Sequence, residues 1–314
     1  MTSLRKLGSS GLEVFPLALG GNVFGWTADE AASFAVLDAY AAAGGNFVDS
    51  ADSYSAWAAG NSGGESETII GKWVKARGNR DDIVIATKVS QHPDYQGLTG
   101  ANIKAAADAS LRRLGTDRID LYYTHFDKPE VPVEEIVGAL DDLVKAGKVR
   151  HIAASNISPG RLRASLEFSD REGLARYVAL QPHYNLVSRD TYEGELQDLA
   201  AASGLAAVPY YALASGFLTG KYRPGTTVDS ARAQGAARHL GTERGQKVLT
   251  ALDEVARAHD AEAATVALAW LAARPTVAAP IASARTVEQL PALLAVADLK
   301  LTEAETTRLT EASA

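Results

Sequence analysis

Segments with the composition of buried β-strands alternate with helically patterned segments along the whole chain, giving eight strand–helix units in succession. This alternation requires parallel strands, because two parallel strands need a crossover connection rather than a tight turn. Eight such units without a linker-like break predict a single (β/α)8 TIM barrel, with residues 1–314 as one domain. An open doubly wound sheet is the alternative, but the phosphate-binding glycine fingerprint expected after its first strand is missing.

Capping residues and glycines set the expected bounds of the elements. Thr27 and Glu30 have the spacing of a capping box, which predicts a helix through about residue 43 that ends at two glycines. Ser158 and Pro159 predict the N-cap and first residue of another helix. Strands are expected at 17–20, up to 49, and at 83–88, 119–125, 149–155, 178–181, 206–210 and 277–281.

A long loop is expected after the seventh strand, from about residue 213 to residue 244. It contains several glycines and a proline, and its length exceeds that of an ordinary connection between barrel elements. Long loops in compact domains are usually lids or binding loops. We therefore expect this loop to cover a bound molecule.

Six of the predicted strands end in polar side chains that do not belong in a buried strand. In parallel β/α folds the carboxyl ends of the strands share one face, and that face carries the chemistry. A row of such residues is hard to explain by packing, so it predicts an active site assembled from many loops. These residues are Asp49, Lys88, His125, Ser155, Asn156, Gln181, Tyr210 and Tyr211.

The composition narrows the class of protein. The chain contains no cysteine, which excludes disulfides, thiolate catalysis and zinc–sulfur sites. The net charge is -7 and the pI about 5.5, and the basic residues are scattered, which argues against a nucleic-acid surface. No signal peptide or membrane-spanning run is evident, and the histidines lack metal-ligand spacing. We expect a cytoplasmic protein without a metal site.

Three of the strand-end residues, together with Tyr54 in the loop after Asp49, suit proton donation to a carbonyl oxygen. Tyr54 lies five residues after Asp49, and Lys88 and His125 end the next two strands. A buried ammonium is expected to stabilise the phenolate and lower the tyrosine pKa, while the carboxylate keeps the lysine charged. Histidine can donate to the same oxygen. A Schiff-base aldolase built on Lys88 is the alternative.

The later strand ends suit a different task. Ser155, Asn156 and Gln181 are neutral donors and acceptors, appropriate for holding a planar carboxamide. Tyr210 offers a flat face on which a ring can stack.

The motifs that carry these residues resemble the aldo-keto reductases over nearly the whole chain. They are RKLGSSGLEVFPLALGG, GGNFVDSADSY, IVIATKV, IDLYYTHFD, RHIAASNIS, ALQPHYNLVSR, PYYALASGFLTGKY and PIASARTVEQL. The resemblance implies an N-terminal β-hairpin before the barrel, with Asp49, Tyr54, Lys88 and His125 as the catalytic residues. It also implies a nicotinamide cofactor and reversible reduction of an aldehyde, ketone or keto-sugar to an alcohol, with Tyr54 as general acid and base.

The resemblance also implies a cofactor site. Tyr210 matches the tyrosine that stacks on nicotinamide in the family, and the family's adenine-reading acid and asparagine are replaced by Ala292 and Leu293. NADPH is expected over NADH, because Arg285 suits a 2′-phosphate and residues 278–286 contain no acid. The implied cofactor residues are Gly21, Asn22, Ser155, Asn156, Gln181, Tyr210, Leu213, Ser215, Lys221, Ser283, Arg285 and Gln289.

The expected partner is a small carbonyl compound, and the sequence carries no signal of oligomeric state. Aromatic walls with a few polar groups suit a sugar, a keto-steroid or an aryl aldehyde alike. A cofactor-binding regulatory or sensor module with little turnover is the second hypothesis. The residues expected at the substrate are Phe24, Trp26, Trp57 and Phe126, with Asn22, Asp127 and Arg189 nearby.

Overall fold

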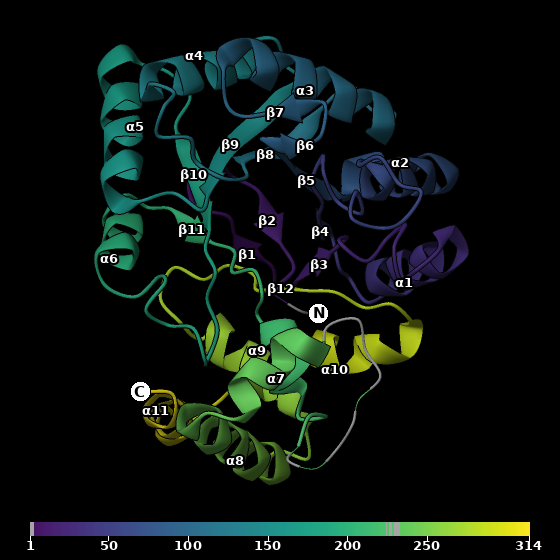
Figure 1. Cartoon of the computed structure of the whole chain (residues 1–314), viewed down its shortest axis with the longest axis vertical. Helices are drawn as coiled ribbons and strands as arrows, with labels where there is room; N and C mark the ends of the chain where they lie inside the picture. The colour runs from purple at the N-terminus through teal and green to yellow at the C-terminus, as the bar shows by residue number, and fades with distance from the viewer. Residues whose placement is uncertain (1–2, 224, 226–227, 229–232) are drawn as a thin grey trace.

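The computed structural model describes residues 3–223, 225, 228 and 233–314. Within this part of the chain, eight parallel strands form one curled sheet in the order β11-β10-β9-β8-β5-β4-β3-β12 (Figure 1). Their bounds are β3 (Ala18–Gly20), β4 (Phe47–Asp49), β5 (Val84–Val89), β8 (Ile119–Thr124), β9 (Val149–Ser155), β10 (Tyr177–Gln181), β11 (Ala206–Ala207) and β12 (Ile281–Ala282).

The two ends of this sheet meet and close it. Ala207 pairs in parallel with Val277, and its N–H donates to the Thr276 carbonyl at 2.8 Å. Further along, the N–H of Ile281 donates to the Pro209 carbonyl at 2.8 Å. A closed ring of parallel strands confirms the predicted (β/α)8 barrel.

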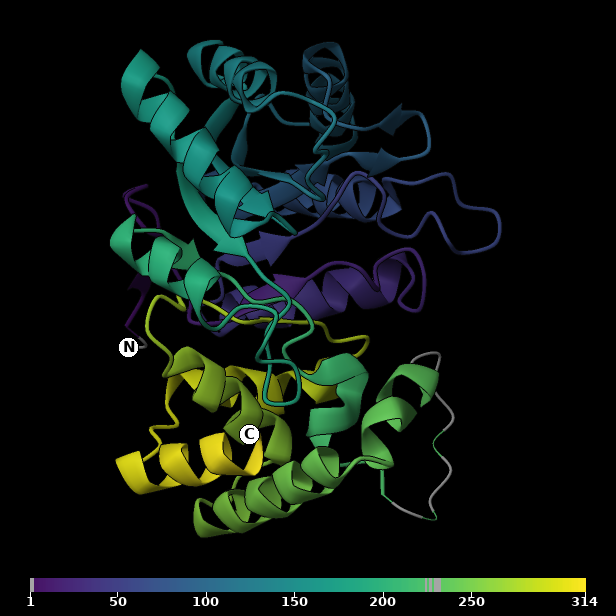
Figure 2. The ribbon, with the colours of Figure 1, turned by 60° about the vertical axis from the view of Figure 1, so that its left-hand side comes forward.

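Helices surround the sheet, and the C-terminal helices α8 and α11 lie outermost on one side (Figures 1 and 2). The helices are α1 (Glu30–Ala42), α2 (Glu65–Arg77), α3 (Gly100–Leu114), α4 (Val133–Lys145), α5 (Pro159–Glu172), α6 (Glu195–Ala202), α7 (Ala233–Leu240), α8 (Glu243–Ala258), α9 (Ala263–Ala272), α10 (Leu290–Leu294) and α11 (Glu303–Ala312). Their apolar faces and the outward faces of the strands form the larger of two hydrophobic cores.

The smaller core fills the inside of the barrel. The predicted N-terminal hairpin is present as β1 (Arg5–Lys6) paired antiparallel with β2 (Glu13–Val14). Its side chains Leu7, Leu12 and Val14 join the inward-facing side chains of the strands in one buried cluster. The hairpin lies on the opposite side of the barrel from the loop between β4 and α2 (Figure 2). It therefore closes the end of the barrel that faces away from the polar strand ends.

The structure corrects several expected bounds. Helix α1 is capped by Asp29, whose carboxylate accepts from the Ala32 N–H at 2.8 Å, and not by Thr27. Thr27 lies instead in a turn in which its N–H donates to the Val23 carbonyl. The strand expected at 206–210 is regular only at Ala206 and Ala207, because Pro209 has no N–H to donate, although the Val208 N–H still donates to the Leu180 carbonyl at 2.8 Å.

Two segments contain structure that the sequence patterns did not predict. A short hairpin, β6 (Gln91–His92) and β7 (Tyr95–Gln96), follows β5. The loop expected at 213–244 contains the 3-10 helix η2 (Ala214–Thr219) and then α7. Part of that expected loop, residues 224, 226–227 and 229–232, lies outside the described residues.

Close packing of α2 on α3 gives a testable consequence. A Cβ atom at Gly71 would come within 2.6 Å of the Leu114 carbonyl carbon, whereas a Cβ at Gly138 in α4 would meet nothing within 4 Å. Gly71→Ala should therefore lower the free energy of unfolding by about 1–3 kcal/mol, since backbone atoms cannot move aside cheaply. Gly138→Ala should raise it by about 0.5–1 kcal/mol through helix propensity. Urea unfolding of both variants checks the pair, and equal effects would contradict the packing.

Candidate active site

The two-residue period of the strands places the predicted site residues at one end of the barrel. In β5, Ala86 lies inside the barrel, so Lys88 faces the same way. In β4, Phe47 lies inside and Asp49 follows it with the same period. Gln181 at the end of β10 reaches the same point, where its side-chain amide donates to Asp49 Oδ1 at 2.9 Å. Each of these polar side chains therefore ends a column of buried apolar ones.

Lys88 lies at the centre of the resulting network. Its Nζ is 2.9 and 2.8 Å from the two Asp49 carboxylate oxygens, 2.6 Å from the Ser50 carbonyl oxygen and 3.0 Å from the Tyr54 hydroxyl. The Tyr54 hydroxyl also lies 3.3 Å from Asp49 Oδ2. Lys88 and Asp49 are 0% and 1% exposed. A fully buried ammonium surrounded by acceptors keeps its charge, and it holds the phenol oxygen in place.

The electrostatics of this network correct one expectation. Burial and the neighbouring Asp49 carboxylate raise the pKa of Tyr54 well above its usual value, so the predicted lowering by Lys88 is wrong for the protein by itself. Burial lowers the pKa of Lys88, and the Asp49 carboxylate opposes this effect. Tyr54 therefore holds its proton throughout the neutral pH range, which is the form that a proton donor needs.

His125 stands beside the tyrosine. The two rings make an edge contact with their centroids 6.0 Å apart. Burial, reinforced by the Lys88 charge, lowers the pKa of His125 well below its usual value. Its Nδ1 is buried and has no hydrogen-bond partner among the described residues. His125 is thus a neutral imidazole, which can donate one hydrogen bond without carrying charge.

The neutral residues form a second network along the next strand ends. The Ser155 hydroxyl donates to the Gln181 carbonyl at 2.8 Å, and the Asn156 amide donates to Ser155 Oγ at 3.0 Å and to the His125 carbonyl at 2.8 Å. Asn156 Oδ1 accepts from the Tyr210 hydroxyl at 2.7 Å. After these contacts, Asn156 Oδ1 keeps one lone pair and the Gln181 amide one N–H, the pair needed to hold a carboxamide.

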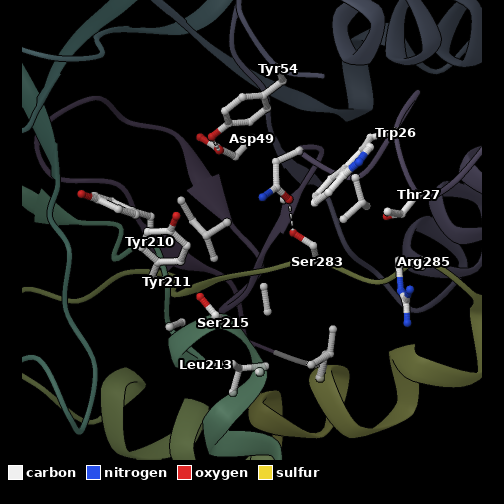
Figure 3. A pocket seen from close by; sticks show the side chains of 18 of the residues that line it. Trp26, Thr27, Asp49, Tyr54, Tyr210, Tyr211, Leu213, Ser215, Ser283 and Arg285 are labelled. Atoms are coloured by element: carbon white, nitrogen blue, oxygen red, sulfur yellow. Dashed lines mark hydrogen bonds between the residues drawn. The ribbon is translucent and has the colours of Figure 1, made fainter. Parts of the chain in front are cut away.

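Most of the predicted site residues line one cavity of about 820 Å³ (Figure 3). Tyr54 and Asp49 lie together in it, apart from Leu213 and Arg285 (Figure 3). The predicted residues on its wall are Asn22, Trp26, Asp49, Tyr54, Trp57, His125, Phe126, Ser155, Asn156, Gln181, Tyr210, Leu213, Ser215, Lys221, Ser283, Arg285 and Gln289.

Three predicted residues do not lie on that wall. Phe24, expected at the substrate, is fully buried in the hydrophobic core, because the turn at Gly21 brings its N–H onto the Gly21 carbonyl and turns the ring inward. Gly21 lies behind the wall, where its N–H donates to the Asp49 carbonyl at 2.8 Å. Lys88 lies behind the wall, with its Nζ 3.0 Å from the Tyr54 hydroxyl and over the face of the Tyr54 ring.

The far part of the cavity carries the predicted phosphate-binding residues. Ser283 Oγ donates to Asn22 Oδ1 at 2.7 Å, and the Arg285 N–H donates to Gln289 Oε1 at 2.8 Å. The guanidinium of Arg285 forms no ion pair within the described part of the chain. Ser215 is held at a φ of 57°, in the left-handed region that non-glycine residues rarely adopt.

Sequence reasoning missed several residues of the wall. Gln91 belongs to the unpredicted β6–β7 hairpin, and Tyr211 was noted only as a strand-end residue. Glu262, the N-cap residue of α9, places a carboxylate on the wall. The other two residues expected nearby are engaged elsewhere, because Asp127 pairs with Arg161 and Arg189 pairs with Glu193.

An acidic residue is buried behind the site without the partner that burial usually requires. Asp52 is 0% exposed, and among the described residues no side chain donates a hydrogen bond to its carboxyl oxygens, which lie near only the backbone N–H groups of Ser53 and His92. Glu67, also 0% exposed, accepts from Thr87 and pairs with Arg113 at 2.6 Å. Burial, followed by the charge of Glu67, raises the pKa of Asp52 to about 8. Asp52 is therefore a neutral acid at pH 7.

This buried acid predicts a dependence of stability on pH. Unfolded Asp52 loses its proton near pH 4 and folded Asp52 near pH 8, so between these values the free energy of unfolding falls as pH rises. The side chain of Asp52→Asn cannot ionise, so the variant does not lose stability in this way. The difference in the free energy of unfolding between Asp52→Asn and wild type should therefore rise by up to about 1.4 kcal/mol per pH unit from pH 5 to 8. Urea unfolding at four pH values checks this, with Asp117→Asn on the surface as the control. Parallel curves for Asp52→Asn and wild type would rule out a neutral Asp52.

No helix in the described part of the chain is long and apolar enough to cross a membrane, and no group of three or more acids and histidines there is arranged to hold a metal.

Comparison with known proteins identifies the family. The model of the aldo/keto reductase family matches residues 16–314. Protein tas of Escherichia coli K12 is 32% identical over 95% of this chain and 94% of its own length. The uncharacterized oxidoreductase YrpG of Bacillus subtilis is 34% identical over 94% and 91%, and the norsolorinic acid reductase stcV of Emericella nidulans is 32% identical over 94% and 77%. The chain belongs to the aldo/keto reductase family and is an oxidoreductase.

Proposed function

We propose that this enzyme reduces the carbonyl group of a small molecule to an alcohol with NADPH, reversibly, and that Tyr54 is the general acid. One observation carries the proposal: the Tyr54 hydroxyl opens onto the cavity while Lys88 and Asp49 hold it from behind. We treat residues 1–314 as one catalytic domain, because residues from Gly20 to Leu293 contribute to the wall of this cavity.

The residues of the cavity fit a nicotinamide dinucleotide. Next to Tyr54, the Gln181 amide and Asn156 Oδ1 offer the donor and acceptor that a carboxamide requires. The ring of Tyr210 stacks on His183, with centroids 5.4 Å apart and an angle of 24° between the rings. This stacking supports Tyr210 from one side, and its other face suits a flat ring. Ser215, Lys221 and Arg285 are suitable partners for phosphate groups farther along.

The bound nicotinamide would supply a hydride to the carbonyl carbon, and the protein residues would manage the proton. Tyr54 keeps its proton until charge develops on the carbonyl oxygen, and its hydroxyl hydrogen then turns from Asp49 to that oxygen. The Lys88 ammonium, 3.0 Å away, stabilises the phenolate that remains. Neutral His125 would donate a hydrogen bond to the same oxygen and orient it.

The charges near Arg285 support a preference for NADPH over NADH. Arg285 and Lys221 place two cations in this part of the wall, where Glu262 is the one acid among the described wall residues, since Asp49 lies beside Tyr54. A 2′-phosphate requires a net positive surrounding, and a guanidinium can clamp it with two charge-assisted hydrogen bonds. Ala292 and Leu293 also line this part of the cavity and offer only apolar contact to adenine.

The two alternatives account for less of the geometry. A Schiff-base lysine must reach its substrate uncharged, whereas Lys88 is 0% exposed, lies beneath Tyr54 and is bound by both Asp49 oxygens. A sensor module with little turnover would need the cofactor residues but not a complete set of residues that donate and accept protons.

The cytoplasmic location expected from the sequence remains a prediction.

The first test removes the proton donor. Tyr54→Phe should lower turnover by about two or more orders of magnitude, the usual scale for general acid catalysis. Cofactor affinity should stay nearly unchanged, because the phenol faces the carbonyl oxygen. Steady-state reduction of a panel of carbonyl compounds, with NADPH binding measured separately, checks both expectations. Tyr211→Phe on the same cavity wall is the control, and near-normal turnover in Tyr54→Phe would point to His125 instead.

The second test concerns the phosphate. Arg285→Ala should weaken NADPH binding by roughly 1.5–3 kcal/mol, the scale of a charged hydrogen bond, and leave NADH binding almost untouched. Dissociation constants for both cofactors, measured by fluorescence titration, provide the comparison. Arg257→Ala, an exposed arginine on α8, is the matched control. Equal losses for both cofactors would show that Arg285 does not recognise the 2′-phosphate.

A further inference from the structure

Exposed aromatic side chains gather at the mouth of the cavity. Five large hydrophobic residues are exposed in the described part of the chain, and three of them, Trp57, Phe126 and Tyr211, line this one cavity. Trp57 and Tyr211 are each 53% exposed. An exposed apolar surface that is concentrated at one place usually marks the position of a ligand.

Two of these rings, Trp57 and Phe126, contact proposed catalytic residues directly. Trp57 meets Trp26 edge to face, with centroids 5.6 Å apart, and meets Tyr54 in the same way at 6.2 Å. Phe126 packs on His125 at 5.0 Å. We name Trp26, Trp57, Phe126 and Tyr211 the aromatic frame. Because it adjoins the proton donor, whatever body is attached to the reacting carbonyl must lie against it.

The side chains beside the aromatic frame carry no charge. Ser53, Ala56 and Gln91 complete this part of the wall, and all three are neutral. The nearest acid in sequence, Asp127, is neutralised by two hydrogen bonds from Arg161, at 2.9 and 3.0 Å. Among the described wall residues, the cations Lys221 and Arg285 belong to the proposed phosphate-binding part of the cavity.

Gln91 is the polar group best placed to select a substrate. Its amide nitrogen donates to the Ser90 carbonyl and hydroxyl oxygens, each at 3.1 Å. The amide nitrogen is therefore occupied by Ser90, and the amide oxygen is the hydrogen-bonding group that Gln91, a residue of the cavity wall, can offer to a substrate.

We infer that the substrate is an uncharged carbonyl compound with a planar aromatic body, and not a keto acid or a phosphorylated or free sugar. This inference rests on the proposed function and narrows it. A flat aromatic ring would bury apolar surface against the aromatic frame and would make edge-to-face contacts with its rings. A carboxylate or phosphate would lose its hydration there without meeting a cation, and a sugar would leave most of its hydroxyl groups without partners. The wall is concave and leads to Tyr54, which suits a small molecule rather than a protein surface (Figure 3).

Matched aldehydes test this inference. The wild-type enzyme should reduce 2-naphthaldehyde with a kcat/KM about 100-fold above that for 6-carboxy-2-naphthaldehyde, chiefly through KM, because the anion is desolvated without a partner. Gln91→Arg places a cation beside the aromatic frame and should narrow this ratio about tenfold. Gln96→Arg, on the facing strand of the same hairpin and off the cavity wall, should leave the ratio unchanged. Comparing ratios between variants cancels the intrinsic reactivities of the two aldehydes.

Two further measurements separate this inference from the proposed function. Trp57→Ala should lower kcat/KM for 2-naphthaldehyde about tenfold more than it lowers kcat/KM for isobutyraldehyde. Calorimetric titration should detect binding of 2-naphthamide and not of 2-naphthoate, whether or not turnover occurs. Failure to reduce any aldehyde would overturn the proposed function, and the two titrations would then decide the inference by themselves. Equal kcat/KM for the neutral and carboxylated aldehydes, or equal binding of amide and anion, would overturn the inference.

Discussion

The ion pair between Lys88 and Asp49 is the interaction on which the site depends. Burying either charge by itself would cost several kcal/mol, so each is stable only while the other is present and the remaining hydrogen bonds are made. Ser50, Tyr54 and Gln181 make those bonds, and each comes from a strand end or the loop beyond it. The pair therefore fixes the relative positions of three segments of the chain. A proton donor held in this way needs little rearrangement when it reacts.

The sequence predicted the positions of the site residues better than their electrostatic state. A polar residue that closes an apolar run is visible in the sequence, which is why Asp49, Lys88 and Gln181 were found. The pKa of Tyr54 depends on how deeply the loop after β4 is buried, and no pattern in the sequence reports this depth. For the same reason no pattern in the sequence distinguishes Asp52, three residues beyond Asp49, from an ordinary loop acid, although both of its oxygens are buried in the structure.

Sequence patterns for helix caps and strand ends were least reliable where a short turn forms in place of the expected element. Thr27 has the spacing of a helix N-cap. However, the N–H groups of residues 26–28 donate to the Val23 carbonyl and form a turn there, so the helix begins later and Asp29 is its N-cap. Phe24 was predicted to lie on the aromatic wall, but the preceding turn, in which its N–H donates to the Gly21 carbonyl, leaves its ring in the hydrophobic core. Gln91 and Tyr211 lie on segments whose backbone path was not predictable from composition. These two residues complete the proposed substrate wall, of which Trp26, Trp57 and Phe126 were predicted from the sequence.

The closure of the barrel has a consequence for its dynamics. β11 and β12 are two residues each, and the seam between them rests on a single bridge at Ala207 and a few adjacent hydrogen bonds, whereas β8 and β9 pair over most of their length. The segments that follow these two short strands both line the proposed cofactor site, with Ser215 on one and Ser283 on the other. A dinucleotide bound there would contact the segment after β11 and the segment after β12 at the same time, and would therefore hold these two edges of the sheet together. Slow exchange of the amide hydrogens of Ala207, Ala278 and Ile281 should then depend on cofactor concentration, because the least connected edge of the barrel opens only when the site is empty.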